Sequence, residues 1–160
     1  MSAREFALFD TAIGSCGIAW SACGVVGVQL PEWHARATRD RLSRRFPDAC
    51  EATPPPDIQQ AIDSIAALLR GEARDLCFVA LDMDGIPPFR RSIYAVLRGI
   101  PAGATLSYGE IATRLGDGSA AREVGEEMGK NPFPIIVPCH RVVAAGGKIG
   151  GFSAAGGVTT

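Results

Sequence analysis

Short apolar runs separated by turn residues open the chain and predict a small sheet. Residues 6–9 and 17–20 are predicted strands separated by a turn that contains glycine, and residues 24–30 predict a third strand. Apolar runs of this length, bounded by glycine and polar residues, are typical of β-strands. The pattern therefore predicts an antiparallel sheet in the first part of the chain.

The apolar positions then change to helical spacing. Residues 33–45 predict a helix with an arginine-rich face, which ends at Phe46-Pro47. After a proline-rich connector, apolar residues recur every three or four positions from Ile58 to Leu69. Asp57 stands where an N-cap is favoured, so a second helix is predicted to begin there.

A predicted strand and a turn mark the end of the first part of the chain. Residues 76–81 are continuously apolar and predict a further strand. The turn sequence Asp84-Gly-Ile-Pro-Pro88 then predicts a boundary between one domain at residues 1–84 and another at residues 85–160.

The second half carries the pattern of short helices. Residues 89–97 predict a helix, and Ser107-Tyr-Gly-Glu110 has the form of a capping box that opens another at residues 108–115. A third helix is predicted at residues 119–129, after the turn Gly116-Asp-Gly118. Two short helices across a glycine turn favour a helix-turn-helix, although most αα-hairpins bind nothing.

Composition narrows the class of protein. The 160 residues, 47% of them hydrophobic, suit one or two compact domains. No apolar run approaches the roughly 20 residues that span a bilayer, and the N-terminus lacks a signal-peptide core, so a cytoplasmic protein is expected. Five irregularly spaced cysteines, without a CxxC pair and with only two histidines, argue against a disulfide framework or a zinc site.

Charge is distributed unevenly. Residues 1–84 carry 8 basic and 12 acidic side chains (−4), and residues 85–160 carry 8 basic and 5 acidic ones (+3), which together give the net −1. A modestly positive C-terminal half is compatible with a polyanionic partner.

One cysteine has the surroundings of a reactive thiol. Cys139 follows a proline and precedes His140 and Arg141, and a neighbouring imidazole or positive charge helps a thiol to ionise. The alternative is an inert thiol of the kind common in protein cores. The other four cysteines (Cys16, Cys23, Cys50 and Cys77) are expected to be structural, and His34 is expected to be exposed to solvent.

Four motifs occur in order and at close spacing. They are Ser107-Tyr-Gly-Glu110, Ala120-Ala-Arg-Glu-Val-Gly125, Asn131-Pro-Phe-Pro-Ile-Ile-Val-Pro-Cys-His-Arg-Val-Val143 and Gly150-Gly-Phe-Ser153. Together they resemble the O6-alkylguanine-DNA alkyltransferases, also called methylated-DNA–protein-cysteine methyltransferases, over residues 88–157. The resemblance implies an α+β fold, with a ribonuclease H-like small α/β domain followed by a mostly helical, winged-helix-like domain that holds the helix-turn-helix.

The resemblance also implies the chemistry. Cys139 would be both nucleophile and acceptor in a single turnover, and His140 would be the general base acting through a water. The product thioether has no easy hydrolytic exit, so the protein would be spent after one reaction. No cofactor and no metal are expected. The expected partner is double-stranded DNA that carries O6-alkylguanine, bound from its minor groove. The protein is expected to be a monomer and not to bind membranes.

A stacked base cannot present O6 to a buried thiol, so the nucleotide must leave the helix. The resemblance implies that Arg122 fills the space left by the flipped base and that Tyr108 contacts the flipped guanine and its 3′ phosphate. It also implies that Ala121 contacts the DNA and that Asn131 is a structural hinge. The expected pocket is formed by Tyr108, Met128, Val142, Phe152 and Ser153.

Departures from the family pattern lower the expected efficiency. Glu123, Glu126 and Glu127 put acid on the predicted recognition helix, where it repels phosphates. The family continues into a final helix whose glutamate orients the histidine, and this chain ends at Thr160 without one. Truncation, a substitute carboxylate and weak activity all stay open.

Two other functions remain as alternatives. A non-catalytic binder of alkylated DNA would share the DNA-reading elements but would lack the reactive cysteine, which argues against it here. A cysteine hydrolase would use Cys139 and His140, but such enzymes usually hold the two residues far apart in sequence.

Overall fold

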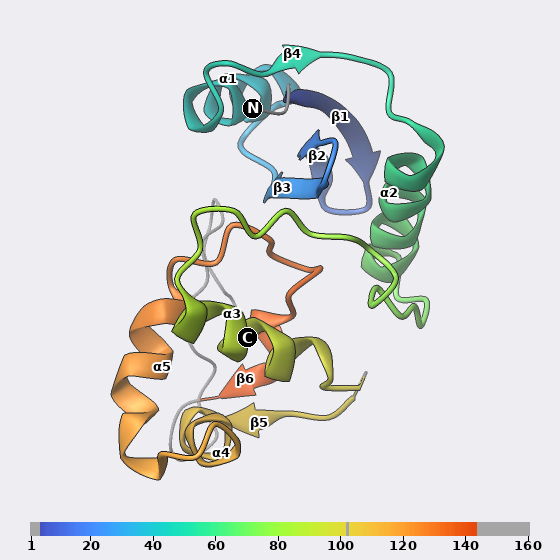
Figure 1. The fold of residues 1–160 in the computed structure, drawn as a ribbon. Helices are drawn as coiled ribbons and strands as arrows, with labels where there is room; N and C mark the ends of the chain where they lie inside the picture. The colour runs from blue at the N-terminus through green and yellow to red at the C-terminus, as the bar shows by residue number, and fades with distance from the viewer. Residues whose placement is uncertain (1–3, 102, 144–160) are drawn as a thin grey trace. The chain divides into compact units, whose positions relative to one another are not determined.

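A computed structural model describes residues 4–101 and 103–143 of the protein, with His140 and Val143 described by their backbone alone. The chain divides into two compact units, Met1–Asp82 and Met83–Thr160. The first contains a sheet with two helices, and the second is mostly helical (Figure 1). The predicted α+β class is therefore confirmed.

The N-terminal unit is built on a mixed sheet in the order β3-β2-β1-β4. The three strands expected from the sequence pair antiparallel, and the short β4 adds a parallel edge beside β1. The strands are β1 (Glu5–Thr11), β2 (Gly14–Ser21), β3 (Gly24–Gln29) and β4 (Cys50–Glu51).

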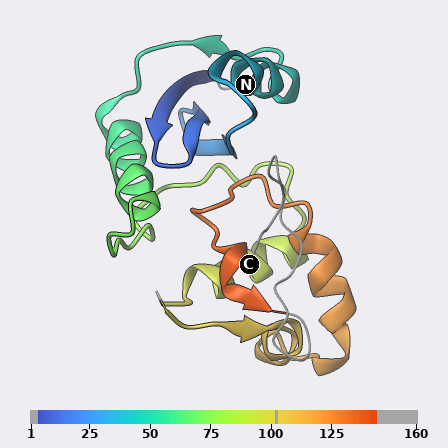
Figure 2. The same cartoon turned by 180° about the vertical axis from the view of Figure 1, so that it is seen from behind.

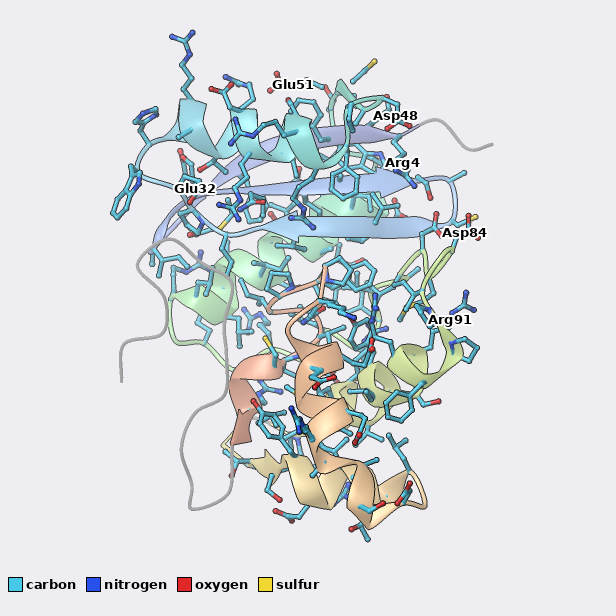
Figure 3. All side chains as sticks on the ribbon, turned by 90° about the vertical axis from the view of Figure 1, so that its left-hand side faces the viewer. Arg4, Glu32, Asp48, Glu51, Asp84 and Arg91 are labelled. Atoms are coloured by element: carbon cyan, nitrogen blue, oxygen red, sulfur yellow. The ribbon has the colours of Figure 1, made fainter. Side chains whose placement is uncertain are left out.

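Helices α1 (Ala35–Arg45) and α2 (Pro56–Leu69) cover opposite faces of this sheet, as Figure 3 shows. Leu42 of α1 is fully buried in a cluster with residues of β1, β2 and β3. A Cβ built on Gly17 of β2 would lie 2.8 Å from Leu42 Cδ2, so the glycine lets α1 approach the sheet closely. Arg4, just before β1, forms a long ion pair with Asp48 (3.9 Å), and both residues are labelled in Figure 3.

Two predictions in this unit were wrong. The second helix is not capped by Asp57; it begins at Pro56 after Pro55, and Asp57 lies in its first turn, where a carboxylate still favours the helix dipole. The apolar run 76–81 is largely irregular, and its pairing in the described chain is an isolated bridge between Leu81 and Val25.

The expected structural cysteines also separate into two kinds. Cys16 is fully buried on β2, whereas Cys23, Cys50 and Cys77 are exposed, so a packing role is wrong for those three. His34 is exposed as expected, and its Nδ1 accepts a hydrogen bond from the backbone N–H of Ala37 (3.1 Å) as the N-cap of α1.

The C-terminal unit contains the predicted helix-turn-helix, in which α4 and α5 flank the turn (Figure 1). The capping box is confirmed, because Ser107 Oγ accepts from Glu110 N and a Glu110 carboxylate oxygen accepts from Ser107 N. The elements are α3 (Pro88–Arg98), β5 (Leu106–Ser107), α4 (Tyr108–Arg114), η1 (Gly118–Ala120), α5 (Ala121–Met128), η2 (Cys139–Arg141) and β6 (Val142–Val143). Within the described residues, no helix has the length and apolar character to cross a membrane.

Candidate functional site

Cys139 is the first residue of the one-turn helix η2 and is 7% exposed. Its backbone N–H donates to Val137 O (2.8 Å), and its carbonyl accepts from Val142 N. The preceding Pro138 restricts the backbone on its N-terminal side. The sulfur-bearing residue is therefore held at a defined place in the fold.

The side chain of Asn131 closes the loop that leads to the cysteine. Asn131 Oδ1 accepts from Phe133 N (2.8 Å), and Asn131 Nδ2 donates to Val137 O (3.1 Å). One amide thus joins the beginning of the loop to the carbonyl that also accepts from Cys139 N. This geometry suits the structural role expected of Asn131.

The same loop contains a strained residue. Ile135 has φ 77°, a left-handed conformation that costs a β-branched residue about 1–3 kcal/mol. Its side chain is 5% exposed, and the loop is closed around it by a hydrogen bond from Val137 N to Phe133 O (2.8 Å). Strain of this kind persists where the surrounding contacts fix the backbone, which is the case just before Cys139.

After Cys139 the chain is fastened to two other elements of the unit. Arg141 Nη1 donates to Ile100 O (2.7 Å), beyond the end of α3. Val142 then pairs with Leu106 as β6 runs parallel to β5, an arrangement visible in Figure 2. Since β5 leads directly into α4, this pairing ties the cysteine segment to the start of the helix-turn-helix.

Tyr108 is the first residue of α4 and is half-buried. A Cβ built on Gly125 of α5 would lie 3.5–3.7 Å from three atoms of the Tyr108 ring, so the ring lies against the α5 backbone. The tyrosine therefore contacts both helices of the motif and is held between them.

Arg122 and Ala121 lie at the N-terminal end of α5, the second helix of the motif. The Arg122 side chain is 88% exposed, and its Nε lies 3.5 Å from Glu126 Oε1 one turn later. Glu123, in the first turn, is also exposed. The expected acidic character of this helix is therefore present on its surface.

Comparison with known proteins gives three consistent findings. The sequence pattern of the family described as "6-O-methylguanine DNA methyltransferase, DNA binding domain" matches residues 88–160. A methylated-DNA–protein-cysteine methyltransferase of Methanothermobacter thermautotrophicus is 33% identical over 142 residues, which are 89% of this chain and 72% of that protein. The crystal structure of Mycobacterium tuberculosis O6-methylguanine methyltransferase matches with a TM-score of 0.73 and 33% identity over 94% of this chain and 84% of that one.

This chain belongs to the methylated-DNA–protein-cysteine methyltransferase family. A structure of Mycobacterium tuberculosis OGT in complex with DNA is also similar, with a TM-score of 0.70 and 32% identity over 96% of this chain and 85% of that one. The family resemblance inferred from the four motifs is thereby confirmed.

The remaining site residues expected of a methyltransferase of this family fall into two groups. Met128, at the end of α5, and Val142, on β6, are both buried in the C-terminal unit. His140 is described only by its backbone, within η2, while Phe152 and Ser153 lie outside the described residues.

Sequence reasoning singled out neither Tyr94 nor Arg90, two residues of α3 that pack against the elements around Cys139. Tyr94 of α3 is fully buried, and burial raises the pKa of its phenol, with a smaller rise from the charge of Cys139. Arg90 Nε, one turn earlier, contacts Glu127 Oε2 at 2.6 Å and so links α3 to α5. The four-residue spacing of Arg90 and Tyr94 places them on one helix face, but nothing in the sequence indicates that this face packs against α5 and Phe133.

Proposed function

We propose that this chain repairs alkylated DNA by transferring the methyl group of O6-methylguanine to its own Cys139. The observation that carries the proposal is the attachment of the Cys139 segment to the helix-turn-helix, through the Asn131 side chain and the β5–β6 pairing. A DNA-reading motif and a restrained thiol are thus parts of one compact unit.

The chemistry is a displacement at carbon. The thiol proton passes to His140, acting through a water, and the sulfur attacks the methyl carbon as a thiolate. The new bond joins Sγ to carbon, the bond between carbon and O6 breaks, and its electron pair stays on the purine. Guanine then takes up one proton, so the products are S-methylcysteine and normal guanine.

The neighbouring residues would bring the base to the sulfur. Arg122, extended from α5, would occupy the space left by the flipped nucleotide, since its planar guanidinium can stack and donate hydrogen bonds. Tyr108 would contact the flipped guanine, with Ala121 against the DNA. The pocket would be completed by Met128, Val142, Phe152 and Ser153.

The product is a thioether, so the reaction would consume one protein per lesion and need no cofactor. The partner would be duplex DNA bound from the minor groove. A monomeric state and a cytoplasmic location stay predictions.

Intact-mass measurement tests the proposal. Mixing the protein with a duplex that carries one O6-methylguanine should add one methyl group, about 14 Da, mapped to the Cys139 peptide at no more than one per molecule. Cys139→Ala should remove transfer and keep lesion binding, and Cys77→Ser, which replaces another thiol, should transfer normally. Lesion binding without any mass gain would instead favour a non-catalytic binder, and methyl gain in Cys139→Ala would refute the assigned nucleophile.

A further inference from the structure

The hydroxyl of Tyr94 is a buried polar group that the proposed reaction leaves unexplained. Tyr94 is 0% exposed, and within the described part of the chain its OH has no hydrogen-bond partner. Buried polar side-chain atoms are nearly always paired, because an unmet hydrogen bond costs about 1–3 kcal/mol. An orphaned hydroxyl at such a place therefore calls for a functional explanation.

The Tyr94 ring packs against the segment that carries the cysteine. The rings of Tyr94 and Phe133 form a T-shaped pair, with centroids 6.2 Å apart and an interplanar angle of 86°. Phe133 is the residue whose N–H donates to Asn131 Oδ1 and whose carbonyl accepts from Val137 N. The phenol is thus positioned by the same loop that positions Cys139.

Charged groups on three elements act on this phenol. They are Arg90 on α3, Glu127 on α5 and Cys139 on η2, where His140 and Arg141 follow in sequence. Burial raises the pKa of Tyr94; Arg90 lowers it, whereas the negative charges of Glu127 and of a Cys139 thiolate raise it further. Tyr94 is therefore a neutral O–H donor at physiological pH.

The Arg90–Glu127 pair keeps the neighbouring charges in balance. Its side chains are 17% and 22% exposed, and the 2.6 Å contact holds the Glu127 carboxylate on Arg90, with Lys130 Nζ 3.6 Å from the other oxygen. The Arg90 guanidinium holds the pKa of Glu127 below its usual range, so the pair is fully ionised at neutral pH. With Glu127 engaged in this way, the phenol hydrogen is available to a different acceptor.

We propose that Tyr94 is a positioning residue for the nucleophile: its hydroxyl donates a hydrogen bond, through one shared buried water, to the thiolate of Cys139. A hydrogen bond to the charged form of a group stabilises that form. Alkylation converts the sulfur to a neutral thioether, a poor acceptor, so the interaction is strong before transfer and weak afterwards. The inference deepens the proposed function and rests on it for its role in repair, but the contact with the thiolate can be measured without DNA.

The first experiment follows the ionisation of Cys139 in Tyr94→Phe. Cys23, Cys50 and Cys77 are replaced by serine in all proteins, so that the exposed thiols do not react. The rate of iodoacetamide alkylation at the Cys139 peptide is then measured against pH. Because one hydrogen bond to the thiolate is lost, the midpoint should rise by about one pH unit in Tyr94→Phe.

Ile93→Val serves as the matched control. Ile93 is buried on the same helix and has no polar atom in its side chain. The midpoint of Cys139 alkylation in Ile93→Val should therefore equal that of the parent protein. An unchanged midpoint in Tyr94→Phe would overturn the proposal. An equal rise in both variants would do so as well, because it would show that a change in packing, and not the loss of the hydroxyl, shifts the ionisation of Cys139.

A second measurement keeps Tyr94 in place. The chain has two tyrosines, so a protein labelled at tyrosine Cζ with carbon-13 gives two resonances, which Tyr108→Phe assigns. The Tyr94 resonance should titrate with the midpoint of Cys139 alkylation, shift again when Cys139 is alkylated, and lose both responses in Cys139→Ala. A Tyr94 resonance that changes neither with the ionisation nor with the alkylation of Cys139 would exclude the contact.

The two proposals fail in different ways. If the parent protein gains no methyl group from O6-methylguanine but the midpoint still depends on Tyr94, the repair function is wrong and the contact stands. If the parent gains the methyl group and the midpoint is insensitive to Tyr94, the contact is wrong and the repair function stands.

Discussion

At the scale of single residues, Cys16 shows what burial alone does to a thiol. It lies on β2 without any exposed surface, and its Sγ is 3.7 Å from Thr11 Oγ1. Burial raises the pKa of Cys16 to about 11, and the Thr11 hydroxyl offsets only part of that rise. Cys16 is therefore protonated and inert at neutral pH, as the sequence predicted for it.

This raised pKa makes stability depend on pH. The folded state holds the Cys16 proton more tightly than the unfolded state does, so the contribution is fully present below about pH 9 and is lost as pH rises towards 11. Urea unfolding should show that the free energy of unfolding falls by about 2 kcal/mol more between pH 8 and pH 10.5 in the parent than in Cys16→Ala. Parallel pH curves for the two proteins would contradict this assignment.

Arg122 allows the base-flipping role to be tested at one side chain. Unstacking a base costs a few kcal/mol, so Arg122→Ala should slow methyl transfer from duplex DNA by about 10–100-fold. Reaction with free O6-benzylguanine, which needs no flipping, should change by less than about 2-fold, as should both reactions in the control Arg36→Ala, an exposed arginine of α1. Single-turnover quench measurements on both substrates provide the rates, and equal losses in Arg122→Ala would count against the role.

At the scale of elements, the start of a helix could be predicted where a side chain of the same helix caps it. The Ser107–Glu110 capping box was readable because both partners lie within one turn. Asp57 was misjudged because Pro55 and Pro56 can begin a helix without a side-chain cap. Residues 76–81 have the composition of a strand, but strand formation depends on a neighbouring edge, and here pairing stops at the Leu81 bridge.

The acidic residues of α5 should lower the affinity of the protein for DNA. Glu126 lies within 3.5 Å of Arg122 and competes with phosphate for the guanidinium. Glu126→Gln should therefore bind duplex DNA about 2–5-fold more tightly at low salt, with a smaller gain at high salt, when measured by fluorescence anisotropy. Glu72→Gln, an exposed carboxylate of the other unit, is the control and should bind as the parent does. A gain that is equal at both salt concentrations would argue against an electrostatic cause.

At the scale of the whole molecule, the motif that contains Cys139 could be recognised from the sequence, whereas the residues that pack around it could not. Cys139, Arg122 and Asn131 lie within motifs whose order in the chain identifies the family. Tyr94 lies 45 residues before Cys139, and only the packing of α3 brings its ring to Phe133. Such contacts depend on how helices pack, which one sequence does not specify.

The division into two units predicts which core variants affect repair. Leu42 belongs to the core of the N-terminal unit, whereas Ile111 of α4 is fully buried in the C-terminal unit. Each change to alanine should lower the free energy of unfolding by about 2–5 kcal/mol. The named contacts that anchor Cys139 come from the C-terminal unit, namely the Asn131 amide, the Arg141 bond to Ile100 and the β5–β6 pair.

Methyl transfer per folded molecule at 25 °C should therefore be unchanged in Leu42→Ala and slowed in Ile111→Ala, which loosens the helix that follows β5. Single-turnover rates, normalised to the amount of protein that can be methylated, separate this effect from unfolding. Equal slowing by both variants would mean that the reactive site depends on the N-terminal core as well, and that the two units act as one in the reaction.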